Sequence, residues 1–94
     1  MIEKVLTVKN KLGLHARAAA RLVAVASKYK CSVTISRHGY NDLIDGKSIL
    51  GILSLAASRG TKLNFILDGE DEYEALKAIV KVVENELTQG EELK

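Results

Sequence analysis

Residues 2–29 read IEKVLTVKNKLGLHARAAARLVAVASKY, and within this stretch the spacing of apolar residues changes from that of a strand to that of a helix. Leu6 and Val8 are two residues apart, as they are on one face of a β-strand, and we expect that strand over 2–9. A polar segment that contains a glycine then interrupts the alternation. Helical spacing follows, which predicts a helix over 16–29 with an inner stripe of Ala19, Leu22, Val23 and Ala26.

The rest of the chain continues to alternate between strand and helix patterns. In order, we expect a strand over 31–36, a turn at 37–39, a return strand over 40–44, a helix over 48–57, a strand over 63–67 and a helix after Gly69. The expected inner stripes of the two later helices are Ile49, Ile52, Leu53 and Ala56, then Tyr73, Leu76, Val80, Val83 and Leu87. The order β-α-β-β-α-β-α predicts an α+β fold in which three helices cover one face of a four-stranded, mainly antiparallel sheet.

Length and composition narrow the class of protein. The chain has 94 residues, which suits a single domain, expected over 1–88 with a frayed tail over 89–94. Apolar residues make up 47% and charged residues 28%, as in ordinary globular proteins. Aromatic residues make up only 4%, so the usual platform for stacking nucleic-acid bases is missing and we expect no nucleic-acid partner.

Location and redox state follow from the same counts. Cys31 is the one cysteine, so the chain has no internal disulfide. No apolar run approaches the roughly 20 residues of a membrane span, and charged residues at positions 3 and 4 interrupt any signal peptide. We therefore expect a cytoplasmic protein with no membrane partner.

The charge is divided unevenly along the chain. Residues 1–47 carry a net charge of +6, and residues 48–94 carry −4. Such a distribution could steer an acidic partner or hold a phosphate on the basic side. It could equally reflect no more than an acidic, solvated last helix.

The stretch Gly13-Leu14-His15-Ala16-Arg17 lies where the loop meets the first helix. Backbone N–H groups at a helix start lack intrahelical partners and carry the positive end of the helix dipole. An anion on His15 would therefore be received by the amides of Ala16 and Arg17 and by the Arg17 guanidinium. The same dipole disfavours the imidazolium form, and a neutral ring beside an anion site is what a phosphoryl acceptor needs. A surface or capping role for His15 remains the alternative.

Other sites have weaker support. His38, in the predicted turn, is interpreted as a surface residue, and two histidines so far apart predict no metal site. No nucleotide or dinucleotide fingerprint is present, and we expect no cofactor.

A second segment, residues 46–55, reads GKSILGILSL. Ser48 is placed as the N-cap of its helix, and that role alone would explain it. Leu50 lies off the inner stripe, so with Leu14 and Leu53 it could form an exposed apolar patch beside His15. A single exposed leucine, however, needs no explanation.

Taken together, these motifs resemble the HPr family, the histidine-containing phosphocarriers of the bacterial phosphotransferase system. Residues 13–17 look like the active-site signature of that family, and residues 47–55 look like its regulatory-serine segment. The resemblance implies that His15 accepts a phosphoryl group on Nδ1 from enzyme I and passes it to enzyme IIA components. It implies that Arg17 compensates charge during transfer and that, in lineages that have one, a dedicated ATP-dependent kinase phosphorylates Ser48. The expected partner-binding residues are Leu14, Arg21, Ile49, Leu50 and Leu53.

The resemblance also has departures and an alternative. Ala18 stands where the family commonly has proline, and Leu12 replaces a small polar residue. The form NKLGLHARAA, residues 10–19, is similar to the nitrogen-related branch of the system, so the output could be regulation and not sugar uptake. A phosphocarrier is a substrate in both transfers, so we expect a monomeric carrier and not an enzyme. The alternative is a regulatory binding module that controls other proteins through Ser48.

Overall fold

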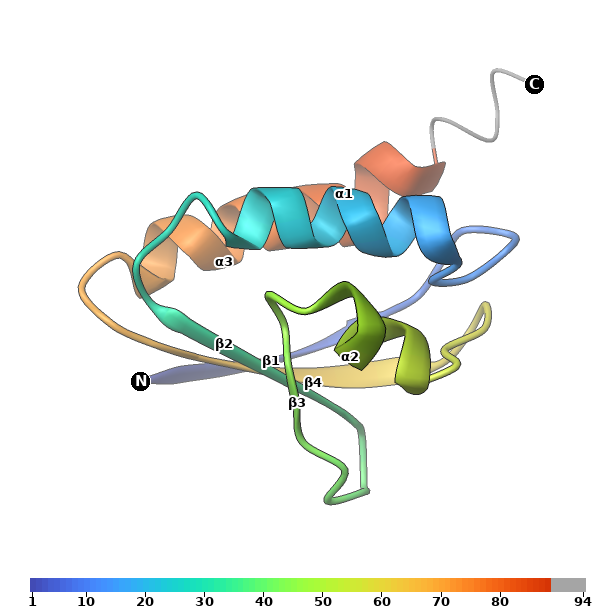
Figure 1. The fold of residues 1–94 in the computed structure, drawn as a ribbon, viewed down its shortest axis with the longest axis horizontal. Helices are drawn as coiled ribbons and strands as arrows, with labels where there is room; N and C mark the ends of the chain where they lie inside the picture. Colours follow the sequence, from blue (N-terminus) through green and yellow to red (C-terminus); the bar gives the residue numbers. More distant parts are fainter. Residues whose placement is uncertain (89–94) are drawn as a thin grey trace.

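The computed structural model describes residues 1–88, and the tail expected to fray, 89–94, lies outside this range. The elements are β1 (Ile2–Thr7), α1 (Ala16–Ala26), β2 (Ser32–Arg37), β3 (Ile44–Asp45), α2 (Ile49–Ser54), β4 (Lys62–Asp68) and α3 (Glu72–Lys81), followed by a π-helical segment, η1 (Val82–Glu86). Figure 1 shows α1, α2 and α3 on the same side of the sheet. The predicted element order and α+β architecture are confirmed.

The four strands form one antiparallel sheet in the order β1-β4-β2-β3. In the register, Leu6 lies opposite Leu63, and Ile35 lies opposite Phe65. These four side chains are buried, because alternate positions on neighbouring strands face the helices together. The alternation read from the sequence is therefore confirmed for β1, β2 and β4.

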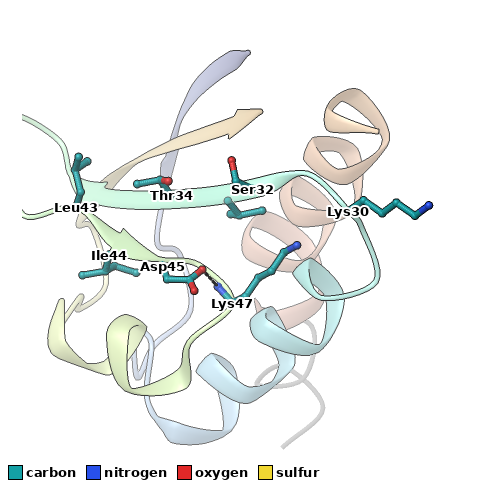
Figure 2. Close-up of a pocket in the computed structure, with 8 residues that line it drawn as sticks. Lys30, Ser32, Thr34, Leu43, Ile44, Asp45 and Lys47 are labelled. Carbon is teal, nitrogen blue, oxygen red and sulfur yellow. Dashed lines mark hydrogen bonds between the residues drawn. The ribbon is translucent and has the colours of Figure 1, made fainter. Parts of the chain in front are cut away.

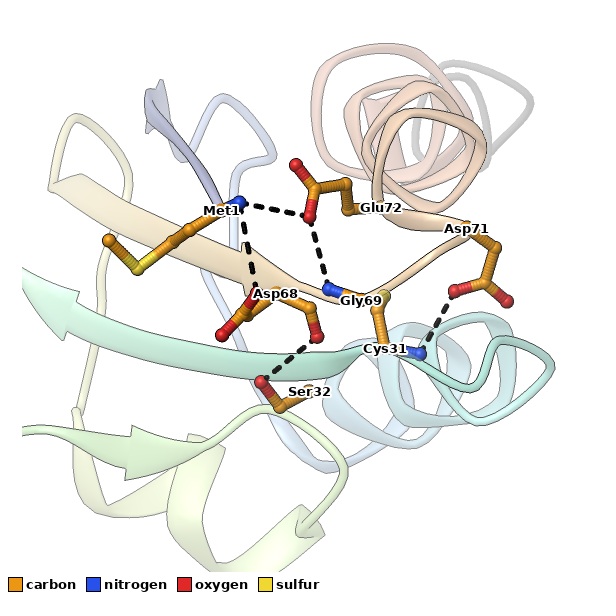
Figure 3. A network of polar contacts seen from close by, with 7 residues as sticks. All are labelled: Met1, Cys31, Ser32, Asp68, Gly69, Asp71 and Glu72. Atoms are coloured by element: carbon orange, nitrogen blue, oxygen red, sulfur yellow. Dashed lines mark hydrogen bonds and ion pairs between the residues drawn. The ribbon is translucent and has the colours of Figure 1, made fainter.

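The inner face of α3 differs from the predicted stripe. Tyr73 is 70% exposed, whereas Glu72, Ala75 and Ile79 are buried. Glu72 fixes the beginning of the helix, since its carboxylate accepts the N–H of Gly69 at 3.0 Å and lies 3.1 Å from the amino group of Met1 (Figure 3). The prediction that Tyr73 packs inward is wrong because the helix begins with Glu72 turned toward the sheet.

The π-helical segment changes the end of the same helix. The adjacent residues Val82 and Val83 are both buried, which an ordinary α-helical turn achieves less easily because it separates neighbours by about 100°. A π turn contains an extra residue and so shifts the buried face. Leu76, Val80 and Leu87 are half-buried against the core, so this part of the predicted stripe is partly correct.

Four elements are also shorter than predicted. The strand β1 ends at Thr7, not at residue 9. The helix α2 ends at Ser54, because Ala56 has a φ of +47° and leaves the helical conformation. The return strand is only two residues long. Its hairpin tip folds on itself, since Arg37 donates to Asp42 at 3.1 Å and lies over the ring of Tyr40 at 4.6 Å. The helix α1 ends at Ala26, not at residue 29.

Candidate functional site

His15 is the N-cap residue of α1, as the sequence predicted. Its backbone is extended, with φ −71° and ψ 178°, and its carbonyl accepts the N–H of Ala19 at 2.8 Å. The half-buried side chain makes no capping hydrogen bond. Within residues 1–88, the N–H groups of Ala16, Arg17 and Ala18 therefore have no partner, and these are donors that an anion could use.

The loop before His15 is held closely against the segment that follows α2. Gly13 has a φ of +67°, and a Cβ there would lie 2.3 Å from the carbonyl oxygen of Ala57. Glycine is needed for both reasons. The N–H of Leu14 donates to the same carbonyl of Ala57 at 2.9 Å. Sequence reasoning missed Ala57, because nothing local marks a carbonyl 43 positions away from Leu14 as its partner.

Leu14 does not belong to an exposed patch. It is only 5% exposed and is part of the hydrophobic core. The expectation of an exposed Leu14 is wrong because its backbone bond to Ala57 draws the residue against the loop behind it. Leu14 therefore anchors the loop beneath His15.

The two arginines of α1 lie in different environments. Arg17 is exposed and forms no hydrogen bond or ion pair with any residue in the described range. Arg21 donates two hydrogen bonds to the Glu86 carboxylate, at 2.7 and 2.9 Å. These bonds lower the pKa of the Glu86 carboxyl. The charge of Arg17 is thus available to an incoming anion, and that of Arg21 is already compensated.

Ser48 has the capping role that its position predicted. It is the N-cap of α2, and its Oγ accepts the N–H of Gly51 at 3.1 Å. The side chain is half-buried. This hydroxyl therefore closes the start of α2.

Exposed apolar side chains lie on α2, which packs against α1 (Figure 1). Leu50 is 79% exposed and Ile49 is 41% exposed. Leu53 is half-buried against the core. Leu50 therefore faces outward and Ile52 is buried, as predicted. The placement of Ile49 on the inner stripe is wrong, because this first residue of the helix lies at its exposed end.

A sizeable hollow lies elsewhere on the molecule. It has a volume of about 540 Å³ and lies between β2 and β3, near Lys47 (Figure 2). Lys47 is already engaged there, since its Nζ donates to the carbonyl of Tyr29 at 2.7 Å. Neither His15 nor Arg17 lines this hollow. At the start of α1, Ala16 and Arg17 are exposed and His15 is half-buried, so this end of the helix is accessible to another protein.

Two further features bear on the class of site. Among the described residues, no group of three or more histidine, cysteine or acidic side chains is arranged to hold a metal ion. Over the same range, no helix has the length and apolar character to cross a bilayer. The functional groups at the start of α1 are the His15 imidazole, the backbone amides of the first turn and the Arg17 guanidinium.

Comparisons with known proteins agree with this geometry. A family described as "PTS HPr component phosphorylation site" matches residues 2–85. Phosphocarrier protein HPr of Pseudomonas aeruginosa is 48% identical over 86 residues, which cover 92% of this chain and 94% of that protein.

Solved structures show the same fold. The crystal structure of HPr-C-His from Thermoanaerobacter tengcongensis matches with a TM-score of 0.85 and 39% identity, over 93% of this chain and 96% of that one. The solution structure of Crh, described as the Bacillus subtilis catabolite repression HPr, matches with a TM-score of 0.65 and 37% identity, over 89% of this chain and 98% of that one.

Proposed function

Because this chain belongs to the HPr family of phosphocarrier proteins, we propose that His15 accepts a phosphoryl group from phospho-enzyme I and donates it to enzyme IIA components. The protein is a phosphocarrier of the phosphotransferase system and not an enzyme. One observation carries the proposal. His15 is the N-cap of a helix whose first N–H groups have no partner in the described structure.

In the accepting step, a lone pair on Nδ1 of a neutral His15 attacks phosphorus. The bond from phosphorus to the donor breaks as the bond to Nδ1 forms, so the phosphoryl group moves without release of free phosphate. The negative charge that gathers on its oxygens is received by the N–H groups of Ala16 and Arg17 and by the Arg17 guanidinium. Neither α1 nor its first turn contributes an acidic residue that would repel this charge.

In the donating step, the phosphoryl group leaves these contacts as it moves from His15 to the acceptor. Ala16 and Arg17 are exposed beside His15, so a partner can approach the phosphoryl group from the side opposite Nδ1. Donors exposed to water bind a phosphoryl group less strongly than donors in a closed pocket. This supports a carrier, which must release its cargo.

As a member of this family, the protein interacts with enzymes of the phosphotransferase system. We assign Ile49, Leu50 and Leu53 to the docking surface, because α2 presents apolar side chains to solvent beside α1. Arg21 is assigned to its edge. Its pairing with Glu86 means that a partner must compete for this guanidinium.

Ser48 is the proposed regulatory site, phosphorylated by a dedicated kinase. A phosphate on Oγ would place about −1.5 to −2 charges at the positive end of α2, where it is favourable. The same charge would lie close to the docking surface of α2. We expect it to repel acidic partners.

A regulatory binding module is the second candidate function. The Crh structure, described as a catabolite repression HPr, supports it. His15 and the unpaired Arg17 favour the carrier, because a purely regulatory protein has no need of a phosphoryl acceptor at α1. The cytoplasmic location, the monomeric state and the choice between sugar uptake and nitrogen regulation stay predictions.

The direct test uses phosphoenolpyruvate and enzyme I. The wild-type chain is expected to gain one acid-labile phosphate, and His15→Ala is expected to gain none. His38→Ala is the matched control, because His38 is exposed in the hairpin, and it should behave as wild type. Labelling of His15→Ala at the wild-type level would refute the carrier role of His15.

A further inference from the structure

Asn10 is a buried polar residue in the loop between β1 and α1. It is only 2% exposed, and Ser36 and Glu72 are the other buried polar or charged residues of the described range. Its Nδ2 donates to the carbonyl oxygen of Gly13 at 2.6 Å, and its own carbonyl accepts the N–H of Gly13 at 3.1 Å. Asn10 therefore holds Gly13 through both its side chain and its backbone.

Gly13, to which Asn10 is hydrogen-bonded, is also contacted from its other side. Gly13 lies directly against the carbonyl of Ala57, and Leu14 donates to that carbonyl at 2.9 Å. The segment that supplies it is tied to the residue that follows β1, since the N–H of Val8 donates to the carbonyl of Thr61 at 2.9 Å. Gly60 in turn donates to Val8 at 2.7 Å. Gly13 and Leu14, the two residues directly before His15, are thus enclosed between Asn10 and a loop anchored on the sheet.

The amide of Asn10 is used only through its N–H group. Its Oδ1 is buried and has no hydrogen-bond partner within the described residues. A buried acceptor without a partner costs about 1–3 kcal/mol, so a purely structural position would favour a smaller or apolar side chain. What remains to explain the asparagine is the bond that it gives to Gly13.

We infer that Asn10 is a positioning residue for phosphoryl transfer at His15, acting through the Gly13 carbonyl. This inference rests on the proposed function. Asn10 makes no contact with the phosphoryl group, but it holds the path of the chain that leads through Gly13 into His15 and the free N–H groups of α1. Displacement of a reacting group by about 1 Å can reduce a rate about 100-fold, so loss of this bond is felt at the transfer step.

The test compares Asn10→Ala with a matched control, Asp71→Ala. The Asp71 carboxylate accepts the N–H groups of Lys30 and Cys31 at 2.8 and 2.9 Å, just beyond the other end of α1. Figure 3 shows the bond from Cys31. Both variants therefore lose a side chain that holds a loop beside α1, and only one of the loops leads into His15. Three quantities are measured: the rate constant for transfer from phospho-enzyme I, the Kd for enzyme I, and the ¹⁵N order parameter of the His15 amide.

For Asn10→Ala, the transfer rate constant is expected to fall about 10- to 100-fold with Kd unchanged within about twofold, and the order parameter of His15 to decrease. Asp71→Ala is expected to lower the Tm and leave the transfer rate constant within about twofold of wild type. Asn10→Ser is measured alongside, with the same expectation in a milder form. If Asn10→Ala does not fold, Asn10→Ser replaces it in the comparison.

Three results would overturn the inference. They are an unchanged rate constant and order parameter in the folded Asn10 variant, a loss confined to Kd, and an equal loss of rate in Asp71→Ala. If wild type takes up no phosphate on His15, the proposed function fails. The order parameter still decides then whether Asn10 holds His15 in place.

Discussion

The helices α1 and α2 both begin after an extended N-cap residue, but only α2 is closed by its own side chain. Ser48 accepts a hydrogen bond from Gly51, whereas His15 accepts none from its helix. Neither helix has an acidic residue in its first turn. In α3, by contrast, Glu72 and Glu74 supply that negative charge.

The difference shows how a helix start becomes a site. Serine satisfies an N–H group with its hydroxyl and so removes a donor from solution. A histidine at the same position leaves the donors free and adds a nucleophile beside them. Of the three helices in the described range, α1 alone has neither a side-chain cap nor first-turn acids, and it carries the candidate phosphoryl acceptor.

The largest effect is expected from His15→Ser, which gives α1 the cap that α2 already has. Acid-labile phosphorylation should be abolished, because the nucleophile is gone. The free energy of unfolding should rise by about 0.5–1 kcal/mol, because serine is a favoured N-cap. Both are read from labelling by enzyme I and from denaturant unfolding, with His38→Ser as the control. A less stable variant would show that the start of α1 is not open to capping.

Arg17→Ala removes the unpaired charge at the open helix start. Transfer should slow by about 10- to 150-fold, since a charge-assisted contact contributes roughly 1.5–3 kcal/mol. Stability should change by less than about 0.5 kcal/mol, because the side chain is exposed. Rapid-quench transfer assays and thermal melts measure the two effects. Normal transfer with a large fall in Tm would reverse this assignment.

Leu50→Asp tests whether the second helix serves docking. Binding to enzyme I should weaken about 30-fold, the loss expected for an interface anchor of about 2 kcal/mol. The fold should be retained, because Leu50 is exposed. Titration calorimetry gives the affinity, and Ile52→Asp, which places a charge in the core, should unfold the protein instead. If Leu50→Asp binds enzyme I with the wild-type affinity, Leu50 is not part of the docking surface.

Changes at Ser48 separate capping from regulation. Ser48→Ala should lower stability by about 0.5–2 kcal/mol, because the bond from Gly51 is lost, and leave enzyme I affinity unchanged. Ser48→Asp keeps a capping oxygen, so its Tm should not fall. Its added charge should weaken enzyme I binding by up to about tenfold. Equal affinity for all three proteins would argue against the switch.

The smallest effect is expected at acid pH, at the start of α3. Asp71 is its N-cap, but the carboxylate accepts the N–H groups of Lys30 and Cys31 instead. The bond from Lys30 is the main reason that the pKa of Asp71 is lowered. Its contribution to stability is therefore present above the unfolded pKa of about 3.9 and is lost as the pH falls through the lower folded value. Unfolding from about pH 6 to about pH 2 should show a shallower acid loss for Asp71→Asn than for wild type.

How much of the structure can be predicted from the sequence depends on how far apart the interacting residues lie along the chain. The inner positions of β1, β2 and β4 were predictable, because alternation along a strand needs no knowledge of the rest of the chain. The inner face of α3 was not predictable in this way. The π-helical segment that begins at Val82 and the hydrogen bond from the N–H of Gly69 to the Glu72 carboxylate rotate that face. Tyr73 was misplaced for this reason.

The sequence by itself determined the order of elements, the start of α1 at His15 and the cap at Ser48. Each of these depends on side chains within about one helical turn, where spacing and cap chemistry decide the conformation. Only the tertiary structure decided that Leu14 is buried, that Asn10 and Ala57 enclose the loop before His15, and that Arg21 is paired while Arg17 is not. Those contacts require packed layers, because the partners of Leu14 and Arg21 lie 43 and 65 positions along the chain and meet only when the helices cover the sheet.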